Sequence, residues 1–545
     1  MRSGAAHPER LRTSSRTITI SERVPGRRIW DSKTGQGRRY IPDTDPPKRE
    51  SPTLPGPFAI DRVGRITQSD VYRTGVRSAN NFDPLSALAS ALPGVRSVGS
   101  GLRLSAKTSP NFMCPPDSNL SNKLWRRRDL LKAIGATAIA GPLVLHTIRS
   151  KAATSKVIKI GHVSPQTGAL APFAEADPFI LEQVRAVLAK GLSNGGVTYQ
   201  VEIISKDSQS KTNRASEVAA DLILKDKVDL LVASSTPETT NPVADQAEAN
   251  EVPCITSITP WQPYYFGRHG TPDKGFTWTY HFFWGLEDVI ASFFALWKSV
   301  ETNKVVGGLF PNDGDGNAWG DAKVGFPSPL QEAGYKLIDT GRFQPLNDDF
   351  GSQISAFKNA GVEIVTGVVI PPDFATFWNQ AAQQGFKPKV VTVGKALLFP
   401  ASVTALGARA DGLSSEIWWS PSHPFKSGLT GQSAKELCDA YEHSTGRGWT
   451  QPIGFQHALF EVAIDVLKRA KNLGEPASIL EAIVATDYNS VVGPIKWSGK
   501  PVKNVSKTPL VAGQWRKTDK GFELVICENS TAPSIPTQDT LKLLG

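Results

Sequence analysis

Apolar and polar positions follow two different periods along residues 156 to 394. Strand-like runs of β-branched and other apolar residues occur at residues 156–164, 228–235, 252–257, 304–310, 335–343, 362–370 and 389–394, and apolar and polar residues alternate at residues 199–207. Apolar residues at helical spacing lie between them, at residues 177–192, 213–226, 241–251, 285–300, 319–334, 349–361 and 373–385. Alternating strands and helices predict a parallel sheet covered by helices on both faces. The rhythm occurs twice in tandem, so we expect two similar α/β lobes.

The amino-terminal part of the chain lacks this pattern. Residues 1 to 112 are dominated by Arg, Ser, Pro and Gly and show no sustained helical or strand period. Met113 is the second of only two methionines. We therefore expect translation to begin at Met113, which makes residues 1–112 an upstream extension without a role in the fold. A translated disordered tail is the alternative.

Residues 113 to 152 have the layout of an export signal. A basic cluster leads into a short Gly/Ala-rich apolar run within "LWRRRDLLKAIGATAIAG". The "RRDLLK" segment resembles the twin-arginine signature, with Arg127 and Arg128 as the pair, and implies passage through the twin-arginine translocase. Ser150 and Ala152 suit signal peptidase, so we expect cleavage near Ala152. The apolar run is too short for a membrane anchor, and an ordinary basic amphipathic helix is the weaker alternative.

The charge of the chain changes at the end of this leader. The whole sequence carries a formal charge of +10, with a pI near 9.3. Residues 1 to 152 hold 26 Lys+Arg and 11 Asp+Glu, which leaves 35 and 40 in the remainder. Because the excess positive charge belongs to the leader, the acidic body gives no reason to expect a nucleic-acid partner.

Motifs for metals, cofactors and catalysis are missing from the body. Its three cysteines, Cys254, Cys438 and Cys527, form no C-x-x-C pair, and we expect free thiols unless two of them meet in the fold. There is no dinucleotide fingerprint, phosphate-binding loop, nucleophile elbow or H-E-x-x-H. We expect no cofactor, no metal and no catalytic residue.

The segment "DGDGNAWGDAKV" begins like a calcium loop, with alternating Asp313, Asp315 and Asn317. Ala318 stands where the loop requires glycine, and Val324 stands where the bidentate glutamate belongs. We therefore interpret it as a surface turn.

Two loops that follow apolar strands are rich in hydroxyl residues: Ser234, Ser235 and Thr236 in one, Ser257 and Thr259 in the other. In an open parallel sheet, ligands bind beyond the carboxyl ends of strands, where helix amino termini also point. These residues are candidates to hold an anion with hydroxyl and N–H groups. Capping of the following helices is the alternative use.

Five segments in order carry a specific resemblance: "GHVSPQTGALAPF", "VDLLVASSTPETTNPVADQAEANEVPCITSITPW", "NDGDGNAWGD", "NDDFGSQISAFKNAGVEIV" and "FATFWNQAAQQGFKPK". Together they resemble the periplasmic solute-binding proteins of branched-chain amino acid type ABC transporters, from Lys156 to about Ala512. The resemblance implies a type I periplasmic binding protein: two doubly wound parallel-sheet lobes joined by a three-strand hinge that closes on a ligand. It also implies a periplasmic location, a small-molecule ligand, a membrane permease as partner and no enzymatic activity.

We place the lobe boundaries on this basis. Lobe 1 is expected to comprise residues 153–280 and 420–488, and lobe 2 residues 281–419 and 489–545.

The resemblance also implies which residues meet the ligand. In that family, hydroxyls and backbone amides of the two loops grip a carboxylate, which here matches Ser234, Ser235, Ser257 and Thr259. Aromatic residues near the cleft match Phe173, Trp319 and Phe455. Each of these aromatic residues is almost as well explained as part of the core.

Two departures from the family pattern bear on the ligand. Amino acid binders need an acidic residue for the ligand ammonium, whereas Lys395 lies near the expected place and suits an acid instead. The loop after residue 257 brings Trp261, Tyr264 and Tyr265 close to the hydroxyls, where ring faces can stack on a flat ligand. We therefore expect an aromatic or otherwise bulky organic acid, with an amino acid as the alternative.

Two other functions remain open at this point. A ligand sensor would use the same fold to signal through a partner. An exported α/β hydrolase would use Ser234 or Ser235 as nucleophile, but the sequence offers no convincing His–Asp pair to activate it.

Overall fold

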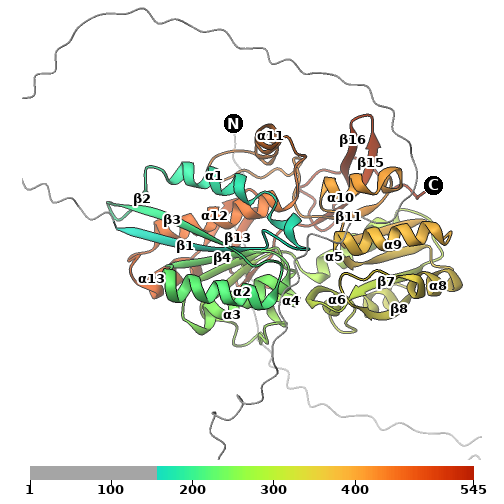
Figure 1. Cartoon of the computed structure of the whole chain (residues 1–545), viewed down its shortest axis with the longest axis horizontal. Coiled ribbons are helices and arrows are strands. Elements are labelled where there is room, and N and C mark those ends of the chain that lie inside the picture. Colours follow the sequence, from blue (N-terminus) through green and yellow to red (C-terminus); the bar gives the residue numbers. More distant parts are fainter. Residues whose placement is uncertain (1–155) are drawn as a thin grey trace, which may run out of the picture. The chain divides into compact units, whose positions relative to one another are not determined.

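A computed structural model describes residues 156–545 of the chain (Figure 1). The predictions for residues 1–112 and for the signal at 113–152, including Arg127, Arg128 and cleavage at Ala152, lie outside the described residues.

Lobe 1 is built on a seven-stranded sheet with the order β14-β6-β5-β4-β1-β3-β2. Its strands are β1 (Val157–Ser164), β2 (Leu192–Asn194), β3 (Val197–Asp207), β4 (Leu230–Ser234), β5 (Cys254–Ser257), β6 (Thr279–Phe282) and β14 (Val505–Ser506). All neighbours pair in parallel except β2, which runs antiparallel to β3 at the edge. The predicted parallel sheet of the first lobe is therefore present.

Helices cover both faces of this sheet because its buried strands are apolar on both sides. Leu230 and Val232 of β4 pack on the side of α1 (Asp177–Leu188) and α12 (Pro452–Arg469). Leu231 and Ala233 face the opposite way, among residues of the helices on the other side of the sheet. The further helical segments of lobe 1 are η1 (Ala171–Ala174), α2 (Thr212–Asp221), η2 (Leu222–Asp226), α3 (Pro237–Ala249), α4 (Trp261–Tyr265), α11 (Ala434–Thr445) and α13 (Pro476–Val484).

Lobe 2 repeats the arrangement with a second seven-stranded sheet, in the order β16-β15-β11-β10-β9-β7-β8. Its strands are β7 (Val305–Pro311), β8 (Lys336–Phe343), β9 (Ile364–Val369), β10 (Val390–Lys395), β11 (Ser414–Ile417), β15 (Val511–Thr518) and β16 (Gly521–Glu528). The last two strands are antiparallel to their neighbours. The helical segments of lobe 2 are α5 (Leu286–Lys298), α6 (Gly314–Trp319), α7 (Pro327–Glu332), α8 (Gly351–Ala360), α9 (Pro371–Gln383), α10 (Pro400–Ala405) and η3 (Gly407–Ala410).

The chain crosses between the lobes three times: after β6, after β11 and after β14. These crossings correspond to the hinge that the sequence predicts. Two of the predicted boundaries are wrong. The boundary at 280/281 falls inside β6, and residues 489 to 506 belong to lobe 1 rather than lobe 2. The reason is strand pairing, since β13 (Gly493–Lys496) pairs with β12 (Asp487–Ser490) and β14 pairs with β6.

The helix predicted over residues 319–334 is also different. The structure has two short helices, α6 and α7, with a turn between them. A Cβ at Gly325 would lie 2.2 Å from the Trp319 carbonyl oxygen, so glycine is required where this turn folds back. Pro327 then starts the second helix, where its missing N–H costs no hydrogen bond.

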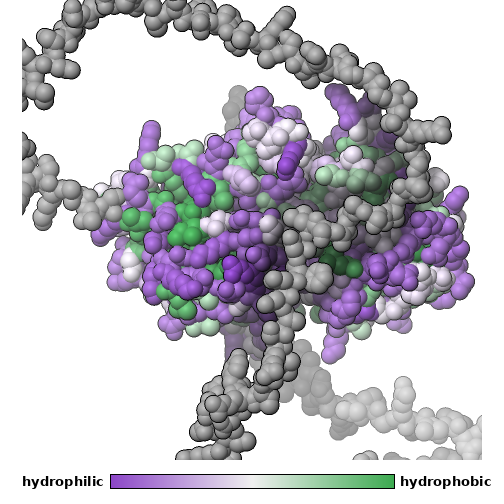
Figure 2. Space-filling view, in the orientation of Figure 1, coloured by the Kyte–Doolittle hydropathy of each residue, from purple (hydrophilic) through white to green (hydrophobic). Residues whose placement is uncertain are grey.

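The surface in the view of Figure 2 is largely hydrophilic over both lobes, with hydrophobic residues gathered near α1 and the edge of the lobe 1 sheet. Exposed apolar side chains in this region include Val157, Val187 and Val197. Within residues 156–545, no helix has the length and apolar character needed to cross a membrane.

Candidate functional site

The carboxyl ends of the parallel strands of both lobes meet at a narrow, partly enclosed space of about 20 Å³, enough for roughly one water molecule. Lobe 1 and the first crossing contribute six of the lining residues. Phe173 lies in η1, and the other five follow β4, β5 or β6: Thr236, Ile258, Pro260, Phe283 and Trp284. Lobe 2 and the second crossing contribute residues at or beyond β7, β9, β10 and β11: Asp315, Trp319, Val368, Lys395, Glu416 and Trp418. This is the edge of open α/β sheets at which ligands bind.

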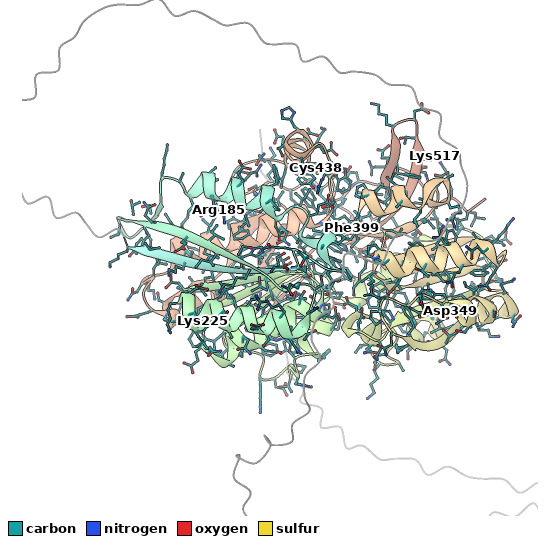
Figure 3. All side chains as sticks on the ribbon, in the orientation of Figure 1. Arg185, Lys225, Asp349, Phe399, Cys438 and Lys517 are labelled. Atoms are coloured by element: carbon teal, nitrogen blue, oxygen red, sulfur yellow. The ribbon has the colours of Figure 1, made fainter. Side chains whose placement is uncertain are left out.

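Aromatic rings make up much of the wall of this space. Five of its twelve lining residues are aromatic, and they come from both lobes. The ring of Phe173 is stacked on Trp418 with centroids 6.4 Å apart, and Phe283 meets Trp418 edge-on at 5.1 Å. Phe399, drawn at the junction of the lobes in Figure 3, lies 5.1 Å from Phe173. A flat apolar group that entered between these rings would be covered by them on several sides.

Charged side chains gather on the lobe 2 side. Lys395 Nζ lies 2.6 Å from Asp315 Oδ2 and 3.3 Å from Asp313 Oδ2. Asp313 is the amino-terminal cap of α6, and its Oδ1 accepts the Gly316 N–H at 2.6 Å. The backbone N–H of Lys395 donates to Glu416 Oε1 at 3.0 Å, and the Ser415 hydroxyl donates to Glu416 Oε2 at 2.8 Å.

The backbone of Lys395 is itself unusual, with a φ of 63°. Residues with a Cβ avoid this left-handed region, and such conformations persist only where the surroundings hold them. The side-chain ion pairs and the backbone bond to Glu416 supply that support. The strained residue therefore lies at the wall of the space between the lobes.

Burial controls the pKa values in this charged group. It raises the pKa of Asp315 to about 7, against the lowering effect of Lys395. It likewise raises the pKa of Glu416 to about 7, although hydrogen bonds from Lys395 and Ser415 oppose the shift. Burial opposes the charge of Lys395, but Asp313, Asp315 and Glu238 outweigh it and raise the pKa of this lysine. The ammonium is therefore retained by its acidic neighbours.

Several polar atoms on the lining residues have no hydrogen-bond partner in the described part of the chain. They are the indole Nε1 atoms of Trp284, Trp319 and Trp418, the hydroxyl of Thr236 and the carboxyl oxygen Oδ1 of Asp315. Buried polar groups in native proteins are almost always paired. Their concentration around one space is typical of a ligand site.

Comparison with protein-family models decides the family. The model described as periplasmic binding protein matches residues 157–520, about two thirds of the chain. The chain belongs to the periplasmic binding protein family. A comparison with curated proteins gives no match.

Solved structures share the fold of this periplasmic binding protein. A solute-binding protein of an ABC transporter from Rhodopseudomonas palustris BisB5, in complex with 3,4-dihydroxybenzoic acid, is 18% identical with a TM-score of 0.57 and covers 70% of this chain and 98% of its own. A second R. palustris transporter protein, in complex with 4-hydroxybenzoate, is 16% identical with a TM-score of 0.55, and the match covers 71% of this chain and 98% of the other. A branched-chain amino acid transporter substrate-binding protein from Streptococcus pneumoniae, in complex with isoleucine, is 18% identical with a TM-score of 0.54. That match covers 68% of this chain and 100% of the other.

Four of the residues that the sequence singles out line this narrow space of the binding protein: Phe173, Thr236, Trp319 and Lys395. Ser234 and Ser235 lie beside Thr236, fully buried, and their hydroxyls have no partner among the described residues. Phe455 lies behind the wall, with its ring 4.9 Å from Phe283.

The other three predicted residues are engaged elsewhere. The Ser257 hydroxyl donates to the Phe282 carbonyl at 2.6 Å, and the Thr259 hydroxyl donates to the Ser235 carbonyl at 2.8 Å. The Trp261 indole donates to Glu287 at 3.0 Å. These three residues hold the loops in place rather than line the space.

The expectation that Tyr264 and Tyr265 present ring faces to the ligand is wrong. Tyr264 stacks on His281 at 4.0 Å, and Tyr265 packs edge-on against Phe276 at 5.2 Å. Both rings are fully buried within lobe 1, where the buried guanidinium of Arg268 lies 4.8 Å from the Tyr264 ring. The aromatic wall comes instead from the crossings and from α6.

The expectation that Lys395 is free to pair with a ligand acid is also wrong, as is the expectation that no acid is available for a ligand ammonium. The structure pairs Lys395 with Asp313 and Asp315, and it places two carboxyl groups, Asp315 and Glu416, at the space. Lys395 alone therefore does not separate an acid from an amino acid as ligand.

Sequence reasoning missed Asp315, Glu416 and the aromatic residues of the crossings. Asp315 was visible only as part of a failed calcium loop, yet it follows β7 at the ligand edge of the sheet. Among residues 156–545 no group of His, Cys, Asp or Glu suits a metal ion. In the described part of the chain, the hydroxyls of Ser234 and Ser235 have no hydrogen bond to a histidine or carboxylate that could act as the base of the hydrolase alternative.

Proposed function

We propose that this periplasmic binding protein is the solute-binding component of an ABC transporter and captures a small aromatic organic acid between its lobes. The observation that carries the proposal is the narrow space at the junction of the lobes, with rings from both lobes in its wall. A ligand held there contacts both lobes at once, so its binding free energy favours the closed arrangement. The closed form is then the one that a membrane permease recognises.

The unpartnered donors favour an acid. Within residues 156–545, three indole N–H groups and the Thr236 hydroxyl have no hydrogen-bond partner, and a ligand carboxylate offers several acceptors. Two structures that share the fold were solved with hydroxybenzoates, which agrees with this class, and another was solved with isoleucine. We further propose that the protein acts in the periplasm, without catalytic activity, after twin-arginine export and cleavage near Ala152.

A thermal-shift series tests the ligand class. The protein isolated after export is heated with benzoate, 4-hydroxybenzoate, phenylacetate, leucine or isoleucine. A ligand at a hundred times its dissociation constant adds about 2.7 kcal/mol to the free energy of unfolding. We expect the aromatic acids to raise the melting temperature and the aliphatic amino acids to leave it unchanged. If leucine alone raised the melting temperature, the ligand would be an aliphatic amino acid and the proposal of an aromatic acid would be wrong.

Capture by closure has a separate readout. Small-angle X-ray scattering of the same protein should show a smaller radius of gyration with ligand than without. An unchanged radius at saturating ligand would contradict hinge closure.

A further inference from the structure

One hydrogen bond between the lobes lies away from their three crossings. Helix α6 of lobe 2 stands against α3 and α4 of lobe 1 (Figure 1). There Glu238 Oε1 of α3 accepts the backbone N–H of Gly314, the first residue of α6, at 2.8 Å. In the described part of the chain, every other hydrogen bond or ion pair between the lobes has a partner within a few residues of a crossing, as for Glu287 with Trp261 and Lys507. A contact beside a crossing moves little when the lobes turn, whereas the Glu238–Gly314 contact is lost when they separate.

Gly314 allows the lobes to come this close. A Cβ at this position would lie 2.8 Å from Pro237 Cβ and 3.1 Å from Glu238 Oε1, and both of these atoms belong to lobe 1. An added methyl group would therefore force the two lobes apart. The backbone of Gly314 does not have the left-handed φ that favours glycine. The missing side chain therefore serves the contact between the lobes rather than the local conformation.

Closure also brings a carboxylate of lobe 1 to the lysine of lobe 2. Burial opposes the charge of Glu238, but Lys395 and the hydrogen bond from Gly314 outweigh it and lower the pKa of this glutamate. Glu238 is one of three acids that raise the pKa of Lys395, and the other two, Asp313 and Asp315, belong to lobe 2. Glu238 thus gains a cation and an N–H donor only when the lobes meet. A charged group that is better paired in one arrangement stabilises that arrangement.

We propose that Glu238 and Gly314 form a latch between the lobes, which sets the closed fraction of the protein and thereby how tightly a ligand is held. Neither residue lines the narrow space at the junction, so both are positioning residues. When only the closed form holds the ligand, the apparent affinity falls in proportion to the closed fraction. The inference rests on the closure that the proposed function requires, but it does not depend on the chemical class of the ligand.

A disulfide across the lobes measures closure without any ligand. Gly448 of lobe 1 and Pro400 of lobe 2 meet at another part of the junction, where a Cβ on Gly448 would lie 3.5 Å from Pro400 Cβ. This separation suits a disulfide bond. The double variant Gly448→Cys/Pro400→Cys, isolated after export and reduced, is oxidised and sampled over time. Mass spectrometry then gives the rate of bond formation, which follows the closed fraction.

The latch variants are introduced into this double variant. We expect Glu238→Ala and Gly314→Ala each to slow bond formation about tenfold, by loss of a hydrogen bond to a charged group and by steric overlap. Glu238→Gln keeps an acceptor for the Gly314 N–H but loses the charge, so its rate should lie between those of Glu238→Ala and the parent. Unchanged rates in both Glu238→Ala and Gly314→Ala would overturn the inference.

Gly351→Ala is the matched control. Gly351 is the first residue of α8, as Gly314 is of α6, and the atoms nearest to its added Cβ belong to Asp349 and Gln384 of the same lobe. This variant should form the disulfide at the parent rate. An equal slowing in Gly351→Ala and Gly314→Ala would overturn the role of the contact between the lobes.

Ligand binding gives a second readout, by calorimetry with 4-hydroxybenzoate and with leucine. The affinity for the compound that binds should fall about tenfold in Glu238→Ala and Gly314→Ala, while the melting temperature of the ligand-free variants stays at the wild-type value. A lower melting temperature with unchanged affinity would make the contact merely structural and overturn the inference. If bond formation is slowed but only leucine binds, the aromatic acid is wrong as ligand and the latch stands.

Discussion

The two halves of the site differ in how their polar groups are held. On the lobe 1 side the groups near the space are mostly neutral, with Glu238 of α3 as the exception: the Thr236 hydroxyl lies at the space, and Thr259 is bound to the Ser235 carbonyl behind it. On the lobe 2 side the groups are ionisable, and Lys395 ties Asp313 and Asp315 together. Both halves stand at the carboxyl ends of parallel strands, so the fold alone does not create the difference.

The difference shows two ways to prepare a buried binding surface. Neutral hydroxyls are cheap to bury once they are bonded to the backbone, so their loops are held mainly by neutral hydrogen bonds and packing. Charges are expensive to bury, and the lobe 2 half is stable only because its acids share a cation. We therefore expect stability to depend on lobe 2 charges and ligand affinity to depend on groups in both halves.

Removal of the shared cation should have the largest effect. Lys395→Met leaves the neighbouring carboxyl groups buried without a counter-charge, which typically costs about 3–5 kcal/mol. The free energy of unfolding, measured by urea denaturation at pH 7.5, should fall by this amount. Lys389→Met is the control, because both members of the Lys389–Glu363 pair at 2.9 Å are only half-buried and such a pair contributes about 0–1 kcal/mol. Equal losses in the two variants would remove the basis of the comparison.

A buried acid without a cation should behave in the opposite way. Burial raises the pKa of Asp177 to about 7, although the Ser164 hydroxyl donates to it. The folded state therefore holds a proton that the unfolded state releases near pH 4, and the associated stability is lost as pH rises from about 4 to 7. Asp177→Asn should match the wild type at pH 4 and exceed it by up to about 4 kcal/mol at pH 8. Thermal unfolding across this range measures the difference, and a constant gap between the two proteins would contradict the assigned titration.

Loss of one ring of the aromatic wall should weaken binding more than it weakens the fold. Phe173 contacts Trp418 and Phe399 across the lobes, and aromatic pairs add about 0.5–1.5 kcal/mol beyond the area they bury. Phe173→Leu keeps most of the apolar volume, so we expect up to about tenfold weaker binding of the aromatic acid in calorimetry. Phe357→Leu, in the separate core of lobe 2, is the control that should leave the affinity unchanged.

The smallest effect should come from a single hydroxyl on the lobe 1 side. Thr236→Val removes a hydroxyl that has no partner in the described residues, so the ligand-free protein should keep its melting temperature. The free energy of binding the acid should become less favourable by the contribution of one hydrogen bond, about 0.5–1.5 kcal/mol. Thr259→Val should do the reverse, since its hydroxyl supports the Ser235 carbonyl at 2.8 Å. A drop in melting temperature for Thr236→Val with no change in affinity would assign its hydroxyl a structural role.

The sequence pattern predicted the sheets better than it predicted the site. The apolar runs at residues 228–235 and 362–370 became β4 and β9, because strands buried on both faces carry an unambiguous signal. The split of residues 319–334 into α6 and α7 was missed, since the close approach of Gly325 to the Trp319 carbonyl is a tertiary contact. The sequence also did not show that residues 489–506 belong to lobe 1. The reason is similar, because β14 pairs with a strand more than two hundred residues earlier.

The sequence by itself determined the class of the fold and which loops end at the ligand edge, because the periodicity of each segment and the alternation of strands and helices along the chain are local properties. Only the tertiary structure decided which side chains of those loops reach the space. Thr236 and Thr259 are both hydroxyl residues after apolar strands, yet one faces the space and the other bonds to a carbonyl. Lys395 likewise changed its role once Asp313 and Asp315, about eighty residues earlier, were found beside it. The reason is physical: a polar side chain acts through its partners, and partners distant in sequence are assigned only by packing.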